Sequence, residues 1–253
     1  MANALVTGGS RGIGRAIAQA LARRGDTVTV HYGQDLEAAQ TTLDSLPGTG
    51  HALAGGDIAD PDAARSIVEQ AVSAMGSIDI LVNNAAVAPD AANRHPVDDS
   101  TYEVWQRQWR RMLDVNLIGA ASITMLVSSH LIDRRAPGAI VNIGSRGAFR
   151  GEPEHPAYAA SKAGLHAFGQ TMAGALAPHG ISVASIAPGF IATDRQAAKL
   201  SGDSGDSIRG QSPFGRVGTA EEVAAAVLYL TSPDAAWASG TILDLNGASH
   251  FRM

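Results

Sequence analysis

A serine, a tyrosine and a lysine have the spacing of a proton-transfer site. An apolar, β-branched run over residues 139–143 leads to Ser145, and Tyr158 opens a predicted helix after a glycine-rich, charged loop. Lys162 follows four residues after Tyr158, so the phenol and the ammonium share one helix face. An ammonium lowers the pKa of a neighbouring phenol towards the range of a general acid. Only two lysines are present, which weakens the alternative that both are unrelated surface residues.

A glycine-rich turn follows the first predicted strand. Residues 7–14 read Thr-Gly-Gly-Ser-Arg-Gly-Ile-Gly and precede an amphipathic helical pattern. Glycines let the backbone approach a pyrophosphate, and the next helix offers it free N–H groups and a positive dipole end. The spacing is Gly-x-x-x-Gly-x-Gly, and a glycine motif alone also fits a flexible connection. Its place between a strand and a helix favours dinucleotide binding.

Strand-like and helix-like segments alternate along the chain and would position these residues. The patterns predict strands at residues 5–6, 27–32, 51–54, 78–82, 139–143, 181–187 and 241–245. They predict helices after the glycine turn, at 36–46, from Asp60-Pro61 to Gly76, across 99–135, from Tyr158 and at 220–230. Such alternation predicts βαβ units and a parallel sheet covered on both faces. We see no linker or repeat, so residues 1–253 are predicted to form one doubly wound α/β domain with about seven strands.

Composition narrows the class of protein. Of 253 residues, 45% are hydrophobic and 17% charged, which is typical of a globular chain. The net charge is −5 without a basic run, so nucleic acid and anionic membrane are poor partners. Without cysteine there is no disulfide or thiolate metal site, and we predict no metal. No signal peptide and no membrane-length apolar stretch are recognised, so we expect a cytoplasmic protein.

Further motifs complete a family pattern. Asp57-Ile58 is an acidic–hydrophobic pair, and Asn83-Asn84-Ala85-Ala86 carries alanine where the pattern has a final glycine. The others are Asn116 in Asp-Val-Asn-Leu, Ser145 placed 13 residues before Tyr158, Pro188-Gly189, the run Gly215–Val223 and Asn246-Gly247. Together with the glycine turn, they closely resemble the short-chain dehydrogenase/reductase family over nearly the whole length. The resemblance implies a Rossmann fold and NAD(P)-dependent oxidoreductase activity on a ketone or secondary alcohol.

The resemblance also assigns catalytic roles. Tyr158 would give a proton to the carbonyl oxygen during reduction, and Lys162 would lower its pKa and hold the nicotinamide ribose. Ser145 would hydrogen-bond the substrate oxygen. Asn116 would hold a water that links Lys162 to solvent.

The same resemblance implies a larger set of coenzyme-binding residues. Asp57 would meet the adenine, and Thr193 would reach the carboxamide or the phosphates. The full expected set is Gly8, Ser10, Arg11, Gly12, Ile13, Gly14, His31, Asp57, Ile58, Asn84, Ala85, Ala86, Tyr158, Lys162, Pro188, Gly189, Ile191 and Thr193.

Charge near the second strand bears on the choice of coenzyme. An NAD-specific site expects a carboxylate about 20 residues past the glycine turn, on the ribose 2′-OH. The strand ends His31-Tyr32-Gly33-Gln34, and Asp35 comes late enough to be a helix cap. Arg11 could pair with a 2′-phosphate. The sequence favours NADP(H), with NAD(H) as the alternative.

The substrate is less well defined by sequence. The chain is similar to 3-oxoacyl carrier-protein reductases, but residues 163–180 contain no lysine or arginine to dock an acidic carrier, and Arg134 and Arg135 lie upstream. We therefore favour a small ketone or ketoacyl ester. A sugar or polyol is the alternative, since Glu152, Glu154 and His155 could bind hydroxyls or only be solvated. A non-catalytic dinucleotide sensor would not need all four catalytic residues.

Two further expectations concern the lid and the assembly. Residues 193–213 are rich in Gly, Ser and Asp and are predicted to form a mobile substrate lid. The helical stretches 112–131 and 157–177 are poor in charge on both faces, which predicts a homotetramer. Gly164→Arg or Ala173→Glu would split it if either residue faces outward. Trp105 and Trp109 are expected to serve packing.

Overall fold

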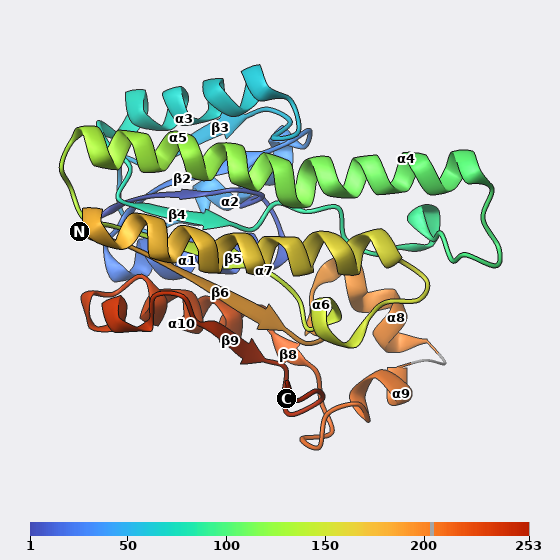
Figure 1. Cartoon of the computed structure of the whole chain (residues 1–253). Coiled ribbons are helices and arrows are strands. Elements are labelled where there is room, and N and C mark those ends of the chain that lie inside the picture. Colours follow the sequence, from blue (N-terminus) through green and yellow to red (C-terminus); the bar gives the residue numbers. More distant parts are fainter. Residues whose placement is uncertain (203–204, 253) are drawn as a thin grey trace.

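A seven-stranded parallel sheet forms the centre of the fold (Figure 1), in a computed structural model that describes residues 1–202 and 205–252. The strand order is β3-β2-β1-β4-β5-β6-β9. In chain order the strands are β1 (Asn3–Val6), β2 (Thr27–Tyr32), β3 (Ala52–Gly55), β4 (Ile80–Asn83), β5 (Gly138–Ile143), β6 (Ile181–Pro188) and β9 (Ile242–Leu245). The order reverses beside β1, which pairs with both β2 and β4. Ligands bind at such a switch point, at the carboxyl ends of the strands.

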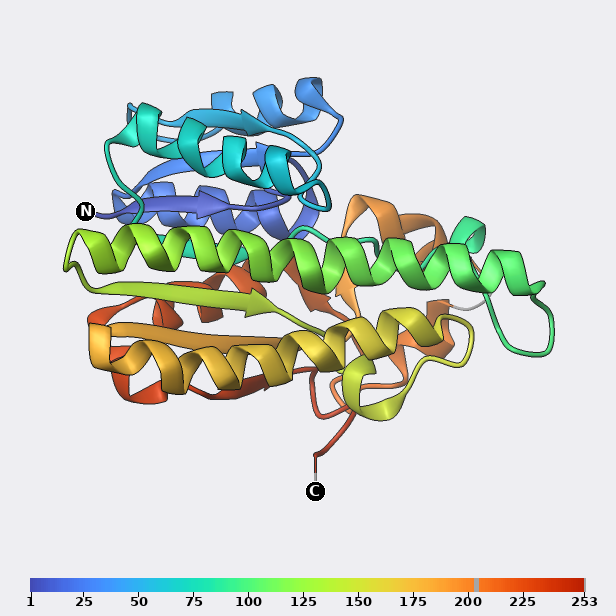
Figure 2. The same ribbon diagram turned by 45° about the horizontal axis from the view of Figure 1, so that its top comes forward.

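Helices cover both faces of the sheet and create two apolar layers (Figures 1 and 2). One layer receives side chains from α1 (Gly12–Arg24), α2 (Leu36–Asp44) and α10 (Ala220–Leu230). The other receives them from α3 (Pro61–Met75), α5 (Ala120–Asp133) and α7 (Pro156–Leu176). Strands buried on both faces by crossover helices confirm the predicted doubly wound fold.

Predicted helix boundaries agree with the structure where the sequence has clear caps. The Asp60 side chain accepts hydrogen bonds from the N–H groups of Asp62 and Ala63, and Gly76 ends α3 at a positive φ of 80°. The stretch predicted across 99–135 is α4 (Tyr102–Leu113), a π-helical segment (Asp114–Gly119) and α5. Sequence periodicity does not reveal the π-helical segment, which widens the helix for about one turn.

Several short elements were not predicted. β7 (Ile191–Ala192) and β8 (Gly218–Thr219) form a separate two-stranded sheet, and α6 (Gly147–Arg150) lies between Ser145 and Tyr158. The predicted lid contains η4 (Asp194–Gln196), α8 (Ala197–Ser201) and α9 (Gly205–Arg209), while residues 203 and 204 lie outside the described residues. The remaining 3₁₀ turns are η1 (Ala91–Asn93), η3 (Ala177–His179) and η5 (Pro233–Ala238).

One helical stretch corrects the expectation that no segment has membrane-spanning length. Tyr102–Asp133 is long and apolar enough to cross a membrane by length and composition, and half of its most apolar window is buried within the fold. Ile123, Val127 and Leu131 are fully buried in the layer beneath α3 and α7. The apolar character of this stretch therefore serves the core.

Candidate active site

A cleft of about 1570 Å³ opens at the carboxyl ends of the strands. The glycine turn after β1 and the segments that follow β3, β4, β5 and β6 line it, together with the start of α7. Every residue predicted to bind the coenzyme lies on its wall, and so do Ser145, Tyr158 and Lys162. Asn116 is the exception among the predicted site residues.

The glycine turn is folded tightly enough to require its glycines. Gly8 and Gly12 have positive φ angles of 62° and 51°, which a residue with a Cβ rarely adopts. A Cβ on Gly14 would lie 2.1 Å from the carbonyl oxygen of Gly8. The turn leads directly into α1, whose first N–H groups have no side-chain cap. Glycine backbone and an uncapped helix N-terminus together fit a pyrophosphate.

Asn84 and Thr7 hold the turn against β4. The Asn84 amide nitrogen donates to the carbonyl oxygens of Thr7 and Gly8, at 3.0 and 2.9 Å. The Thr7 hydroxyl accepts from the backbone N–H groups of Asn84 and Ala85. Asn84 thus shapes the coenzyme cradle through the backbone, a role its motif did not reveal. Thr7 is a functional residue that the sequence analysis missed.

His31 braces two loops of the cleft. Its Nδ1 accepts the Gly8 N–H at 3.0 Å, and its Nε2 lies 2.9 Å from the Gly56 carbonyl oxygen. This geometry requires the neutral tautomer with the proton on Nε2, because Nδ1 must accept. Burial lowers the pKa of His31 and favours that neutral form. His31 lines the cleft and also positions the glycine turn.

Asp57 is held in place at the predicted adenine end. Its carboxylate accepts the Ala59 N–H at 3.0 Å and pairs with Arg111 at 3.0 Å. Its neighbour Ile58 is buried in the apolar layer of α3. The acidic–hydrophobic pair therefore anchors this loop to the core and leaves the carboxylate at the cleft wall.

Arg11 forms an ion pair with Asp35 at the mouth of the cleft. Asp35 caps α2 as predicted, accepting the Ala38 N–H at 2.8 Å. Asp35 and Glu37 both line the cleft, and Asp35 reaches Arg11 in the glycine turn. The chain bends after β2 and returns Asp35 towards the glycine turn, which a count of residues along the strand does not reveal. Arg11 is thus partly neutralised.

Ser145, Tyr158 and Lys162, the residues predicted to be catalytic, meet between β5 and α7. Ser145 follows the end of β5, and its hydroxyl accepts the Gly147 N–H at 3.0 Å and hydrogen-bonds to the Tyr158 phenol. Lys162 is buried and donates from Nζ to the Ile143 carbonyl oxygen at 2.8 Å. The strand end and the first two turns of α7 therefore bring together all three residues.

The pKa of Tyr158 differs from the expectation. Burial raises it, and the hydrogen bond with Ser145 lowers it by less. Burial lowers the pKa of Lys162 itself to about 8. Tyr158 is therefore protonated at neutral pH, which is the form that donates a proton.

Asn116 lies behind the cleft, in the π-helical segment. Its Oδ1 accepts the Val87 N–H at 2.7 Å, and its Nδ2 donates to the Ser161 hydroxyl at 3.0 Å. Ser161 immediately precedes Lys162. Asn116 thus connects the loop after β4 to α7, while the predicted water relay stays a prediction.

Two buried histidines contact the backbone at Ser145 and beside Tyr158, and both were missed by the sequence analysis. His166 lies one turn beyond Lys162, and its Nε2 is 3.4 Å from the Ser145 backbone nitrogen. His95 accepts the Ala157 N–H at 3.1 Å, next to Tyr158. A single histidine on an apolar helix or in a loop carries no sequence signal for such a contact.

The end of β6 and the segment that follows it line the cleft and reach the glycine turn. Pro188, Gly189 and Ile191 line the cleft, and a Cβ on Gly12 would lie 3.2 Å from the Thr193 Cγ2. Thr193 therefore lies beside the glycine turn, and its contact with the carboxamide or the phosphates stays a prediction.

The polar loop after Ser145 is occupied by internal contacts. Glu152 pairs with Arg150 at 3.4 Å, Glu154 pairs with Arg94, and His155 Nε2 lies 2.9 Å from the Asp90 carbonyl oxygen. These side chains still line the cleft. Their partners reduce the number of groups that remain for the hydroxyls of a sugar.

Two other sequence features have structural explanations. Thr219 and Glu222 form a capping box at the start of α10, and Arg216 pairs with Glu222 at 2.6 Å. The hydrogen bond from Arg216, with that from Thr219, lowers the pKa of Glu222 to about 2. The rings of Trp105 and Trp109 pack together, 5.6 Å apart between centroids, as expected of packing.

Comparison with known proteins agrees with this geometry. A family model described as enoyl-(acyl carrier protein) reductase matches residues 8–250. The 3-oxoacyl-(acyl-carrier-protein) reductase of Escherichia coli (strain K12) is 38% identical over 247 residues, which cover 98% of this chain and 96% of that protein. The Vibrio cholerae enzyme of the same name is 34% identical. The crystal structure of a short chain dehydrogenase from Burkholderia cenocepacia J2315 in complex with NADP has a TM-score of 0.86 at 34% identity, covering 98% of this chain and 97% of that one.

Proposed function

The chain belongs to the short-chain dehydrogenase/reductase family, and we propose that it uses NADPH to reduce a ketone to a secondary alcohol. The observation that carries the proposal is the meeting of Ser145, Tyr158 and Lys162 in the same cleft as the glycine turn. NADPH supplies the hydride when it is bound. The protein supplies a proton donor, a hydrogen-bond partner for the reacting oxygen and a dinucleotide cradle.

The proton comes from the Tyr158 phenol. Its raised pKa keeps it protonated until the carbonyl oxygen gains negative charge. Ser145, already hydrogen-bonded to Tyr158, contacts the same oxygen and stabilises the developing charge. Lys162 holds the nicotinamide ribose, and Asn116 supports its helix through Ser161.

NADP(H) is the preferred coenzyme. Arg11 lines the cleft and is the residue that we assign to the 2′-phosphate, and the structural neighbour from Burkholderia cenocepacia was solved with NADP. A phosphate dianion competes for Arg11 with the single carboxylate of Asp35. Exchange of the Asp35 contact for the phosphate gives selectivity over NAD(H).

The substrate is a 3-oxoacyl compound or a small ketone. Several relatives are named 3-oxoacyl-(acyl-carrier-protein) reductases, which supports the first class. Arg134 pairs with Asp79 at the opposite end of β4, so it is not available beside the cleft. Arg150, Arg195 and Lys199 do line the cleft. Residues 163–180 of the chain contain no lysine or arginine, as the sequence analysis noted, but basic residues are present at the cleft itself. Carrier-protein and small thioesters both need testing.

We also propose one domain with a lid and a homotetrameric assembly. The described part of the predicted lid lines the cleft with Asp194, Lys199, Ile208 and Gln211. Ile118 and Met125 of the π-helical segment and α5 are 52% and 61% exposed, seven residues apart and so on one helical face. That apolar face supports a contact with a second copy.

Coenzyme consumption tests the proposed function. Purified protein is assayed with NADPH and NADH against small ketones, 3-oxoacyl thioesters and carrier-linked thioesters, and with NADP⁺ against sugar alcohols. Tyr158→Phe is the control, and it should lose about 10²–10⁴-fold in kcat while binding NADPH normally. Retention of more than a tenth of kcat would remove Tyr158 from the acid role. Turnover of sugar alcohols alone would favour a polyol dehydrogenase.

A further inference from the structure

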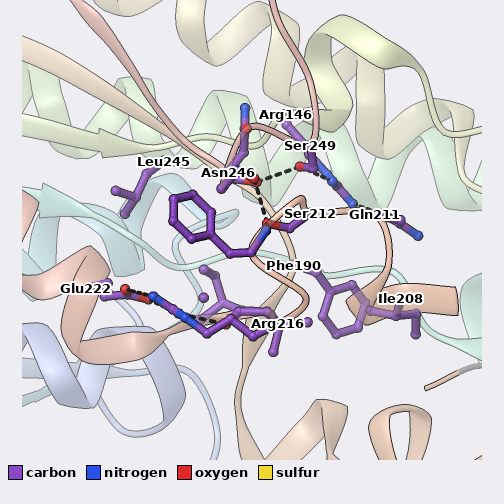
Figure 3. Close-up of a pocket in the computed structure, with 15 residues that line it drawn as sticks. Arg146, Phe190, Ile208, Gln211, Ser212, Arg216, Glu222, Leu245, Asn246 and Ser249 are labelled. Carbon is purple, nitrogen blue, oxygen red and sulfur yellow. Dashed lines mark hydrogen bonds and ion pairs between the residues drawn. The ribbon is translucent and has the colours of Figure 1, made fainter. Parts of the chain in front are cut away.

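Arg146 is a buried cation beside the reacting groups. It directly follows Ser145 and is only 5% exposed. It lines the main cleft and a side cavity of about 210 Å³ that shares Gln211 and Ile208 with it. Figure 3 shows its guanidinium directed towards Gln211 and Ser249, at the edge of that cavity. The apolar wall of the cavity includes Phe190 and Leu245.

The hydrogen-bond partners of Arg146 are neutral, and the charges that act on it are those of Arg150 and Glu152. Its Nη1 donates to the Ser249 hydroxyl, and its Nη2 donates to the Gln211 side-chain oxygen, both of which are neutral. Among the described residues, none of the ion pairs includes Arg146. A guanidinium remains protonated in proteins, and a buried charge without a counter-charge is unfavourable.

The local balance of charge amounts to one positive charge. Arg150 follows one helical turn later, and its Nη1 lies 3.5 Å from the same Gln211 oxygen. Glu152 pairs with Arg150 and so offsets one of the two arginines. Two guanidinium groups around a neutral amide therefore form a site for a single negative charge.

We propose that Arg146 binds a carboxylate of the substrate, so that the substrate is an oxo acid with a short hydrocarbon chain. This inference rests on the proposed ketone reduction. The carboxylate would lie in the same cleft as the ketone, because Arg146 and Ser145 both line that cleft, and the hydrocarbon chain would enter the side cavity. A planar guanidinium matches a carboxylate with two parallel hydrogen bonds. The coenzyme phosphates belong to the glycine turn after β1, on another strand.

The alternative is that Arg146 has only a structural role, as a link (a tie) between segments of the chain. It joins the loop after β5 to the lid through Gln211 and to the C-terminal segment through Ser249. A tie would affect charged and uncharged ketones alike, whereas a carboxylate site would affect only the acids. The difference between acid and ester therefore separates the two roles.

The test compares oxo acids of increasing chain length with their methyl esters, by NADPH oxidation. The measured quantity is the ratio of kcat/KM for an acid to kcat/KM for its ester. Arg146→Gln should lower this ratio at least about tenfold for the preferred chain length, since hydrogen bonds between charged groups contribute about 1.5–3 kcal/mol. Arg195→Gln is the control, because Arg195 is exposed on the same cleft, and it should leave the ratio within about threefold.

Three outcomes would overturn the inference. One is wild-type preference for the ester at every chain length, and another is an unchanged ratio in Arg146→Gln. The third is an equal loss of kcat/KM for acid and ester in Arg146→Gln, which would show that Arg146 only links the loop after β5 to the lid and the C-terminal segment. None of these three outcomes contradicts the proposed ketone reductase activity. If no ketone is reduced at all, the proposed function fails. Calorimetry then tests separately whether Arg146 binds a carboxylate. Binding of an oxo acid but not its ester to the NADP⁺-loaded protein, lost in Arg146→Gln, would support the carboxylate site, and its absence would refute it.

Discussion

The Nε2 atom of His166 accepts a hydrogen bond from the backbone N–H of Ser145 across 3.4 Å. This contact requires the proton on Nδ1, which is buried without a partner among the described residues. Burial, more than any other cause, lowers the pKa of His166 to about 4. The loop that carries Ser145 therefore rests on a histidine that must stay neutral.

Acid should destabilise the fold through His166. Its pKa is lower in the folded protein than in the unfolded chain, so its contribution is complete above about pH 6.5 and is lost as the pH falls towards 4. The loss should reach up to about 3 kcal/mol in the free energy of unfolding. Urea unfolding of wild type and His166→Leu between pH 7 and 4 checks this. The variant should lose less stability, since His31, His95 and His130 contribute equally to both proteins; parallel curves would contradict the assignment.

The Arg11–Asp35 ion pair predicts opposite effects of two substitutions on coenzyme affinity. Arg11→Ala should weaken NADPH by roughly 1–3 kcal/mol and leave NADH nearly unchanged. Asp35→Asn should tighten NADPH, because it removes a competing carboxylate while asparagine still caps α2. Dissociation constants from fluorescence titration of both coenzymes decide the matter. Equal losses for NADPH and NADH in Arg11→Ala would mean that Arg11 contacts only shared phosphates or nothing.

Local patterns were sufficient to predict the sheet, and they selected Ser145, Tyr158 and Lys162, whose catalytic role stays a prediction. The strands β2, β5 and β6 are rich in β-branched residues, and Ser145, Tyr158 and Lys162 lie close together in sequence. Parallel topology then brings the ends of β1, β4, β5 and β6 to one edge.

Contacts between distant segments could not be predicted in this way. The pair Arg11–Asp35 depends on how the chain bends after β2, and the contact of His166 with Ser145 depends on which face of α7 meets β5. The burial of Arg146 requires Gln211 and Ser249, which come from the lid and the C-terminal segment. None of these leaves a periodic signal in one sequence.

The segment at residues 193–213 should exchange its amide protons faster than the core. Its elements α8 and α9 have five residues each, so few backbone groups are protected by helical hydrogen bonds. Hydrogen exchange monitored by mass spectrometry should show fast labelling of peptides covering α8 and α9, and slower labelling once NADP⁺ and a substrate analogue are present. The peptide covering β6 is the internal reference. Protection of α8 and α9 equal to that of β6, without ligands, would count against a lid.

The last prediction is a homotetramer that assembles through the outer faces of α5 and α7. The two substitutions expected from the sequence do not test it, because a Cβ on Gly164 would lie 2.9 Å from Leu117 and Ala173 is buried in the core. Gly174 has open space around its Cβ position, and Met125 is 61% exposed on α5. Met125→Glu should therefore disrupt the assembly without disturbing the core, because a charge would be buried in an apolar contact.

Light scattering coupled to size exclusion measures this directly. Wild type should elute as four copies of the 26.0 kDa chain, and Met125→Glu as a smaller species with the same circular dichroism. Leu36→Glu is the matched control, since Leu36 is 53% exposed on α2, away from α5 and α7, and this variant should keep the wild-type mass. A wild-type species of 26.0 kDa that is active at micromolar concentration would refute the tetramer. Such a species would be a monomer, and the twofold contacts between copies would be absent from it.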